Sequence, residues 1–78
     1  MAIEVLSPSD RKSDVNSKIS DWIEAGAVSV WVVDPARHTI EAHRKGAKVV
    51  HYFRSDVLDD EPTLPGFTLS LPDLFSAE

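Results

Sequence analysis

One acidic residue inside an apolar run is the first feature of this sequence that could do chemistry. Glu4 is flanked by Ile3, Val5 and Leu6. A carboxylate among apolar side chains must be charge-paired, protonated or bound to a metal, because burying it alone costs on the order of several kcal/mol. Taken by itself, Glu4 could equally be a solvated or salt-bridged residue at the edge of a sheet. It is therefore a candidate metal ligand with a structural alternative.

Lys18 is the second candidate, and its place on a predicted helix gives it access to Glu4. The apolar residues of the segment from about Asp10 to Ala25 recur at i, i+4, i+7 and i+8, which predicts an amphipathic helix. On a helical wheel Lys18 lies at the edge of the apolar stripe, from which its long side chain could turn inward toward Glu4. Alternatively, Lys18 pairs with Asp14 or Asp21 on the helix surface.

The surrounding elements predict a single small α/β (α+β) domain over residues 1–78. Residues 2–6 form a strand, and residues 28–33 are apolar and β-branched enough for a central strand covered on both faces. A helix between them makes a β-α-β unit with parallel strands. A hairpin of 39–44 and 47–53 around Lys45-Gly46 follows, and a tail of turns and a short strand completes the chain.

Composition limits the classes of partner. The 78 residues include no cysteine and carry a formal charge of −5, so no disulfide supports the core and no electrostatic footprint favours nucleic acid. A nucleic-acid partner would have to use a local cluster such as Arg11-Lys12 with Lys18 nearby. No apolar run approaches the roughly 20 residues that span a bilayer, which predicts no membrane partner and a cytoplasmic protein.

The three histidines do not predict a metal site. With a two-residue turn at Lys45-Gly46, the side chains of His43 and His51 point to opposite faces of the hairpin, and only a three-residue loop would bring them to one face. His38 precedes the hairpin in a predicted turn. A metal role for the histidines is therefore not expected.

Two further groups are interpreted as structural. Residues 56–61 include four acids but lack the glycine and the spacing of a calcium-binding loop, so the run is expected to be a solvated loop. Trp22 and Trp31 are both expected to lie in the core.

Several motifs, taken in order, resemble the C-terminal half of the Uma-two family of restriction-endonuclease-like proteins. The similarity covers nearly the whole chain, and the order and spacing of the separate motifs make it specific. The matching segments are Ile3–Asp10, Lys18, Ala25–Gly26, Val30–Pro35, Leu64–Phe67 and Asp73–Phe75.

The resemblance implies a truncated restriction-endonuclease-like core of the PD-(D/E)XK superfamily, in which acids on a bent sheet hold a divalent metal and a lysine helps to activate water. By this resemblance Glu4 is the catalytic acid and metal ligand, and Lys18 is the catalytic lysine supplied from the following helix. Leu6 stands where the superfamily pattern has its own lysine. The implied reaction is Mg-dependent hydrolysis of a phosphodiester bond.

The sequence also departs from the family, because the first metal-binding aspartate of its members has no counterpart here. Mg²⁺ requires several oxygen ligands, so Glu4 alone predicts weak metal binding and weak or no activity. The alternative function is a non-catalytic oligomerising module. The strand of residues 2–6 would have one unpaired edge, unless the tail near residues 68–71 covers it. An unpaired edge is a template for pairing with another copy, which predicts a homodimer or higher homo-oligomer.

Overall fold

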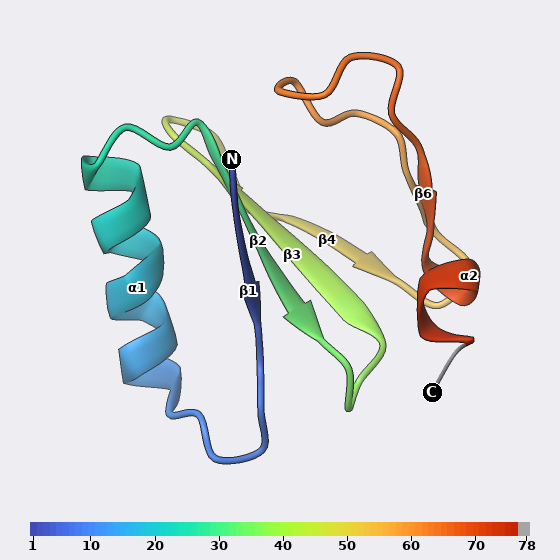
Figure 1. Ribbon diagram of the computed structural model, residues 1–78, viewed down its shortest axis with the longest axis horizontal. Helices are drawn as coiled ribbons and strands as arrows, with labels where there is room; N and C mark the ends of the chain where they lie inside the picture. Colours follow the sequence, from blue (N-terminus) through green and yellow to red (C-terminus); the bar gives the residue numbers. More distant parts are fainter. Residues whose placement is uncertain (77–78) are drawn as a thin grey trace.

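The computed structural model describes residues 1–76 and shows a mixed α/β fold built on a four-stranded sheet (Figure 1). The elements in chain order are β1 (Ala2–Val5), α1 (Lys12–Glu24), β2 (Ser29–Asp34), β3 (Thr39–Arg44), β4 (Val50–Phe53), β5 (Val57–Leu58), β6 (Leu69–Ser70) and α2 (Leu71–Phe75).

The strand order confirms the predicted β-α-β unit and hairpin. The sheet runs β1-β2-β3-β4, with β1 parallel to β2 and the other neighbours antiparallel. The helix α1 connects the two parallel strands, as such a connection requires. The first four residues of β2 are buried, which confirms the prediction of a central strand covered on both faces.

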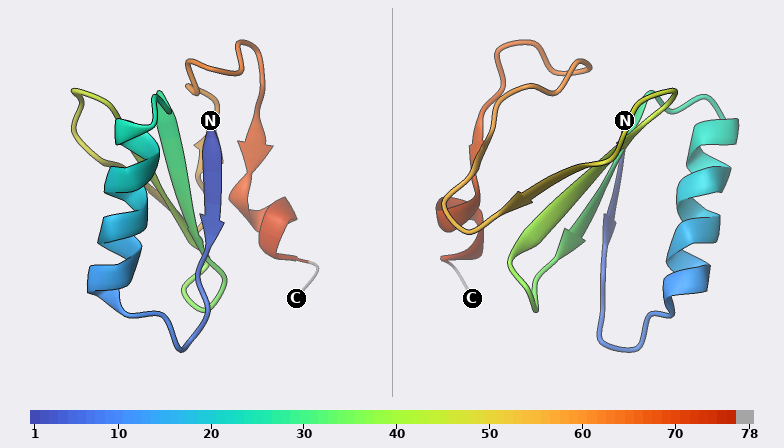
Figure 2. Two further views of the ribbon diagram at one scale, coloured as in Figure 1. Left: turned by 60° about the vertical axis from the view of Figure 1, so that its left-hand side comes forward. Right: turned by 180° about the vertical axis from the view of Figure 1, so that it is seen from behind.

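Two layers cover the two faces of the sheet, α1 on one side and the tail on the other (Figure 2). On the α1 face, Ile19 packs with Ala2, Val30 and Val32. On the opposite face, a larger cluster joins β2, β3 and β4 to the tail. Its buried members are Trp31, Ile40, Ala42, Tyr52, Leu58, Leu71 and Phe75. The core prediction is thus confirmed for Trp31, but it is wrong for Trp22, which is 45% exposed.

The helix α1 is shorter than predicted, and its start is organised by the preceding loop. Asp10 accepts a hydrogen bond from the backbone N–H of Ser7 at 2.8 Å, so the chain turns before the helix instead of within it. Arg11 occupies the N-cap position and makes no side-chain hydrogen bond that caps the helix. At the other end, Gly26 has a φ of +104° and terminates the helix.

The hairpin has a longer connection than the predicted two-residue turn. Glu41 pairs with His51 and Ala42 with Val50, and residues 45–49 link the two strands. Residues that face each other across an antiparallel pair point to the same face. This register therefore places His43 and His51 on one face, the alternative that a longer loop allowed.

The outer edge of β1 is open within residues 1–76. The tail strand β6 pairs with β5 and not with β1. The backbone N–H of Leu6 bonds to Val33, and because backbone groups alternate along a strand, those of Ile3 and Val5 point away from β2. The side chains of Ile3 and Val5 are 53% and 62% exposed. Separately, no helix within residues 1–76 has the length and apolar character that crossing a membrane requires.

Candidate functional site

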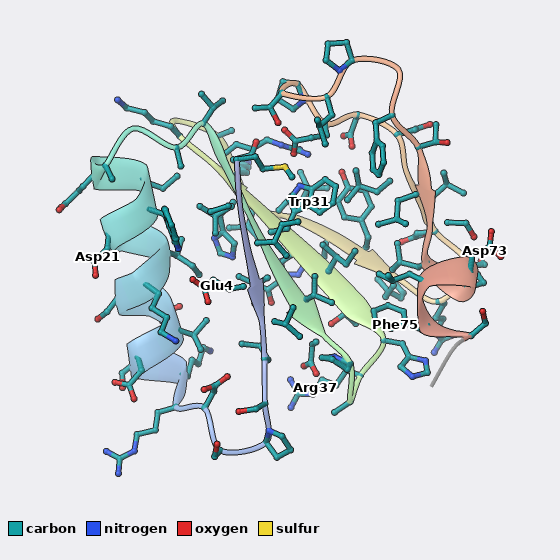
Figure 3. All side chains as sticks on the ribbon, in the orientation of Figure 1. Glu4, Asp21, Trp31, Arg37, Asp73 and Phe75 are labelled. Atoms are coloured by element: carbon teal, nitrogen blue, oxygen red, sulfur yellow. The ribbon has the colours of Figure 1, made fainter. Side chains whose placement is uncertain are left out.

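Glu4 is a residue of β1, and its side chain lies between β1 and α1 (Figure 3). Its neighbours along the same face of β1, Ala2 and Leu6, belong to the apolar cluster beneath the helix. Trp22 donates a hydrogen bond from Nε1 to Oε1 of Glu4 at 2.8 Å. Trp22 follows the buried Ile19 by three residues, so it occupies the margin of the apolar stripe beside β1. Glu4 is thus half-buried and hydrogen-bonded to Trp22.

Lys18 lies one helical turn before Trp22, in the same row of the helix surface. Its side chain is exposed, and no ion pair of 4.0 Å or shorter joins it to Glu4, Asp14 or Asp21 within residues 1–76. The side of α1 that carries Lys18 and Trp22 therefore lies next to Glu4, but none of these three ion pairs forms among the described residues. The catalytic roles of Glu4 and Lys18 stay predictions.

The described residues do not complete a site for a divalent cation. Mg²⁺ prefers an octahedral set of oxygen ligands and is held in proteins by carboxylates together with waters or substrate phosphates. Within residues 1–76 no group of three or more His, Cys, Asp or Glu side chains could hold a metal ion. Glu4 offers one carboxylate, of which Oε1 already accepts the indole N–H of Trp22. A metal site that includes Glu4 needs ligands from elsewhere.

A second ionisable cluster lies on the same sheet face as Glu4, two strands away. Oε1 of Glu41 lies 3.1 Å from Nε2 of His43, and Oε2 of Glu41 lies 3.8 Å from Nδ1 of His51. The two histidines contact different oxygens of one carboxylate. Within residues 1–76 these three side chains do not form a group that could hold a metal ion.

Glu61 is the acid that sequence reasoning misjudged. The prediction of a solvated loop is wrong for this residue, which is 3% exposed. Its carboxylate accepts hydrogen bonds from Ser29 Oγ (2.8 Å), Trp31 Nε1 (2.7 Å), Arg44 Nη2 (3.2 Å) and both the backbone N–H and the hydroxyl of Thr63 (3.0 and 2.9 Å). Burial alone would raise the pKa of Glu61, but the donors, led by the backbone of Thr63, lower it from 4.5 to about 2.

The network around Glu61 continues to the surface through Arg44 and Tyr52. The hydroxyl of Tyr52 donates to Asp60, and Nη2 of Arg44 lies 3.9 Å from the same carboxylate. Burial, followed by the hydrogen bond to Asp60, raises the pKa of Tyr52. Burial opposes the charge of Arg44, but bonds to Tyr52 and Glu61 outweigh it and raise its pKa. This network ties the loop after β5 to the sheet and leaves Glu61 no open position for a ligand.

A surface groove is separate from Glu4. A groove of about 860 Å³ runs between the first half of α1 and the turn from β2 to β3. Basic Lys12 and Arg37 line it together with acidic Asp10, Asp34 and Glu41. Glu4, Trp22 and Lys18 are not among its lining residues. Its mixed charge selects neither an anion nor a cation, so the groove does not mark the chemistry of this chain.

Comparison with known proteins supplies the context for Glu4. Residues 1–72 match the Uma2 family model, described as "Putative restriction endonuclease". The chain is also similar to a solved structure, described as a putative nuclease belonging to DUF820 from Anabaena variabilis ATCC 29413. The identity is 29% with a TM-score of 0.82, and the match covers 95% of this chain and 42% of that one. The chain thus spans less than half the length of this relative. No protein with a curated description matches it.

Proposed function

The chain belongs to the Uma2 family of restriction-endonuclease-like proteins, and from that premise we propose that it carries the glutamate part of a metal-dependent nuclease site. In this proposal Glu4 is one ligand of a divalent cation, with Mg²⁺ as the physiological choice, and Lys18 orients or polarises the attacking water. The substrate class is a nucleic-acid phosphodiester. The observation that carries the proposal is the half-buried Glu4, held by a single donor from residues 1–76.

The position of Glu4 on β1 supports a site that is completed from outside residues 1–76. Trp22 and Lys18 lie along one side of the apolar stripe of α1. The groove lies against the other side of this stripe, where Asn16 is one of its lining residues. The described part of the chain leaves the outer edge of β1 unpaired. A strand laid along that edge would place its side chains beside Glu4, at the spacing of neighbouring strands. An acid on such a strand would supply the second carboxylate.

Calorimetric titration with Mg²⁺ and Mn²⁺ tests the proposal. We expect the 78-residue chain to bind either metal no more tightly than a Kd of about 1 mM, because one carboxylate gives a poor site for a hard cation. Glu4→Gln should abolish this binding, whereas the control Glu24→Gln, at an exposed glutamate of α1, should leave it unchanged. Binding that survives Glu4→Gln would contradict the proposed role of Glu4.

A nuclease assay with labelled DNA and RNA complements the titration. We expect the isolated chain with Mg²⁺ or Mn²⁺ to cleave neither substrate above the level of Glu4→Gln. Cleavage by the wild type that is lost in both Glu4→Gln and Lys18→Met would instead show a complete site. Cleavage that persists in both variants would contradict the proposed residues.

The open edge of β1 favours a second candidate, a homo-oligomerising module. The exposed Ile3 and Val5 and their outward backbone groups form a template on which a second copy could pair. Sedimentation at micromolar concentration should then show a dimer or larger assembly, and Val5→Lys should dissociate it. The control Val57→Lys, at an exposed valine of β5, should not. A wild type that sediments as an 8.6 kDa monomer would rule this candidate out.

A further inference from the structure

We propose that Trp22 is the positioning residue of Glu4. Its indole N–H holds one carboxylate oxygen of Glu4, and the other oxygen is left for a cation or a water. The hydrogen bond between Trp22 and Glu4 does not depend on the proposed function. Its effect on cation binding rests on that function.

Trp22 lies at a position of α1 where its ring is only partly buried. Trp22 is 45% exposed, so much of its ring does not contribute to the core. The neighbouring positions of the stripe, Ile19 and Ile23, already pack on the sheet. The polar end of the indole is instead directed at Glu4, with 2.8 Å between Nε1 and Oε1. A residue with a large exposed surface and one aimed donor fits positioning better than packing.

The bond leaves Glu4 with acceptor capacity. An ionised carboxylate has about four lone-pair sites. Trp22 is the hydrogen-bond donor that residues 1–76 present to Glu4, and it engages Oε1 alone. By contrast, Glu61 receives donors at both oxygens. A donor that orients a ligand side chain while the other oxygen stays available is the role that partners of metal ligands play in known sites.

The indole N–H resonances provide a direct test, because the chain has only two tryptophans. In ¹⁵N-labelled protein without metal, Glu4→Gln should shift the Trp22 resonance, since a neutral amide is a weaker acceptor than a carboxylate. The Trp31 resonance should not move, and the control Glu24→Gln should move neither. An unchanged Trp22 resonance in Glu4→Gln would overturn the proposal.

Trp22→Phe separates positioning from packing, because it keeps an aromatic ring and removes the donor. We expect Mn²⁺ affinity, measured by electron paramagnetic resonance of the free ion, to fall about 10-fold. The melting temperature of Trp22→Phe should equal that of the control Phe53→Leu, which changes another exposed aromatic residue. A lower melting temperature with unchanged affinity would assign Trp22 to packing and overturn the proposal. If the wild type binds no Mn²⁺ through Glu4, the proposed function fails. In that case the change of the Trp22 indole resonance in Glu4→Gln still tests whether Trp22 positions Glu4.

Discussion

Two tryptophan–glutamate pairs use the same hydrogen bond for different purposes. Trp22 donates to Glu4 at 2.8 Å, and Trp31 donates to Glu61 at 2.7 Å. The first pair lies between β1 and α1 beside an open sheet edge, and the second is buried between the sheet and the tail. The bond alone therefore does not distinguish a site from a structural contact.

The remaining acceptor capacity of each carboxylate makes the difference. Glu61 is buried, and its two oxygens accept bonds from Ser29, Trp31, Arg44 and Thr63, so a ligand could enter only by breaking them. Glu4 is half-buried and receives one donor from residues 1–76. A saturated acid stabilises the fold, whereas an acid held by one donor can still bind something else.

The largest expected effect is at Glu61. Glu61→Ala removes the acceptor for Ser29 and Trp31 and leaves the partly buried Arg44 charge without its closest partner. We expect the free energy of unfolding to fall by about 3 kcal/mol, the cost of breaking a buried ion pair by removing one partner. Urea unfolding measures this. The control Asp59→Ala, an exposed residue of the same loop, should change stability by about 0.5 kcal/mol or less. A similar loss in both variants would contradict the assignment.

Acid titration should reveal the same saturated carboxylate. The pKa of Glu61 is lowered from 4.5 in the unfolded chain to about 2 in the folded one. Its stabilising contribution, on the order of 3 kcal/mol, is therefore present above pH 4.5 and is lost as the pH falls toward 2. Unfolding measured at several pH values should show this decline. In Glu61→Gln the decline should be reduced by that amount, and an unaltered pH profile would argue against the network.

The smallest stability effect is expected at Glu4. Glu4→Gln keeps an acceptor for Trp22 at a partly exposed position, so the free energy of unfolding should change by only about 0.5 kcal/mol. Thermal unfolding checks this. A loss comparable to that of Glu61→Ala would place Glu4 among the structural residues and remove the contrast between the two pairs.

The elements were predictable from the sequence because their signals are local. The spacing of Val15, Ile19 and Ile23 predicted α1, and the apolar run of 28–33 predicted β2. The burial of Glu61 was not predictable, since its partners Ser29 and Trp31 lie about 30 residues away and meet it only when the tail docks.

The tryptophans and the hairpin show the same limit. The helical periodicity predicted that Trp22 lies in the core, but only the position of α1 over β1 decides that its ring is exposed and its N–H meets Glu4. The faces of His43 and His51 depend on the length of the 45–49 connection, which the Lys45-Gly46 turn signal underestimated.

Mn²⁺ titration followed on the two indole N–H resonances tests the central claim most directly. The account predicts that substoichiometric Mn²⁺ broadens the Trp22 resonance first, that Trp31 is much less affected, and that Glu4→Gln removes the difference. Equal broadening of both resonances, or broadening of Trp22 that persists in Glu4→Gln, would contradict the claim that Glu4 is the acid with open binding capacity.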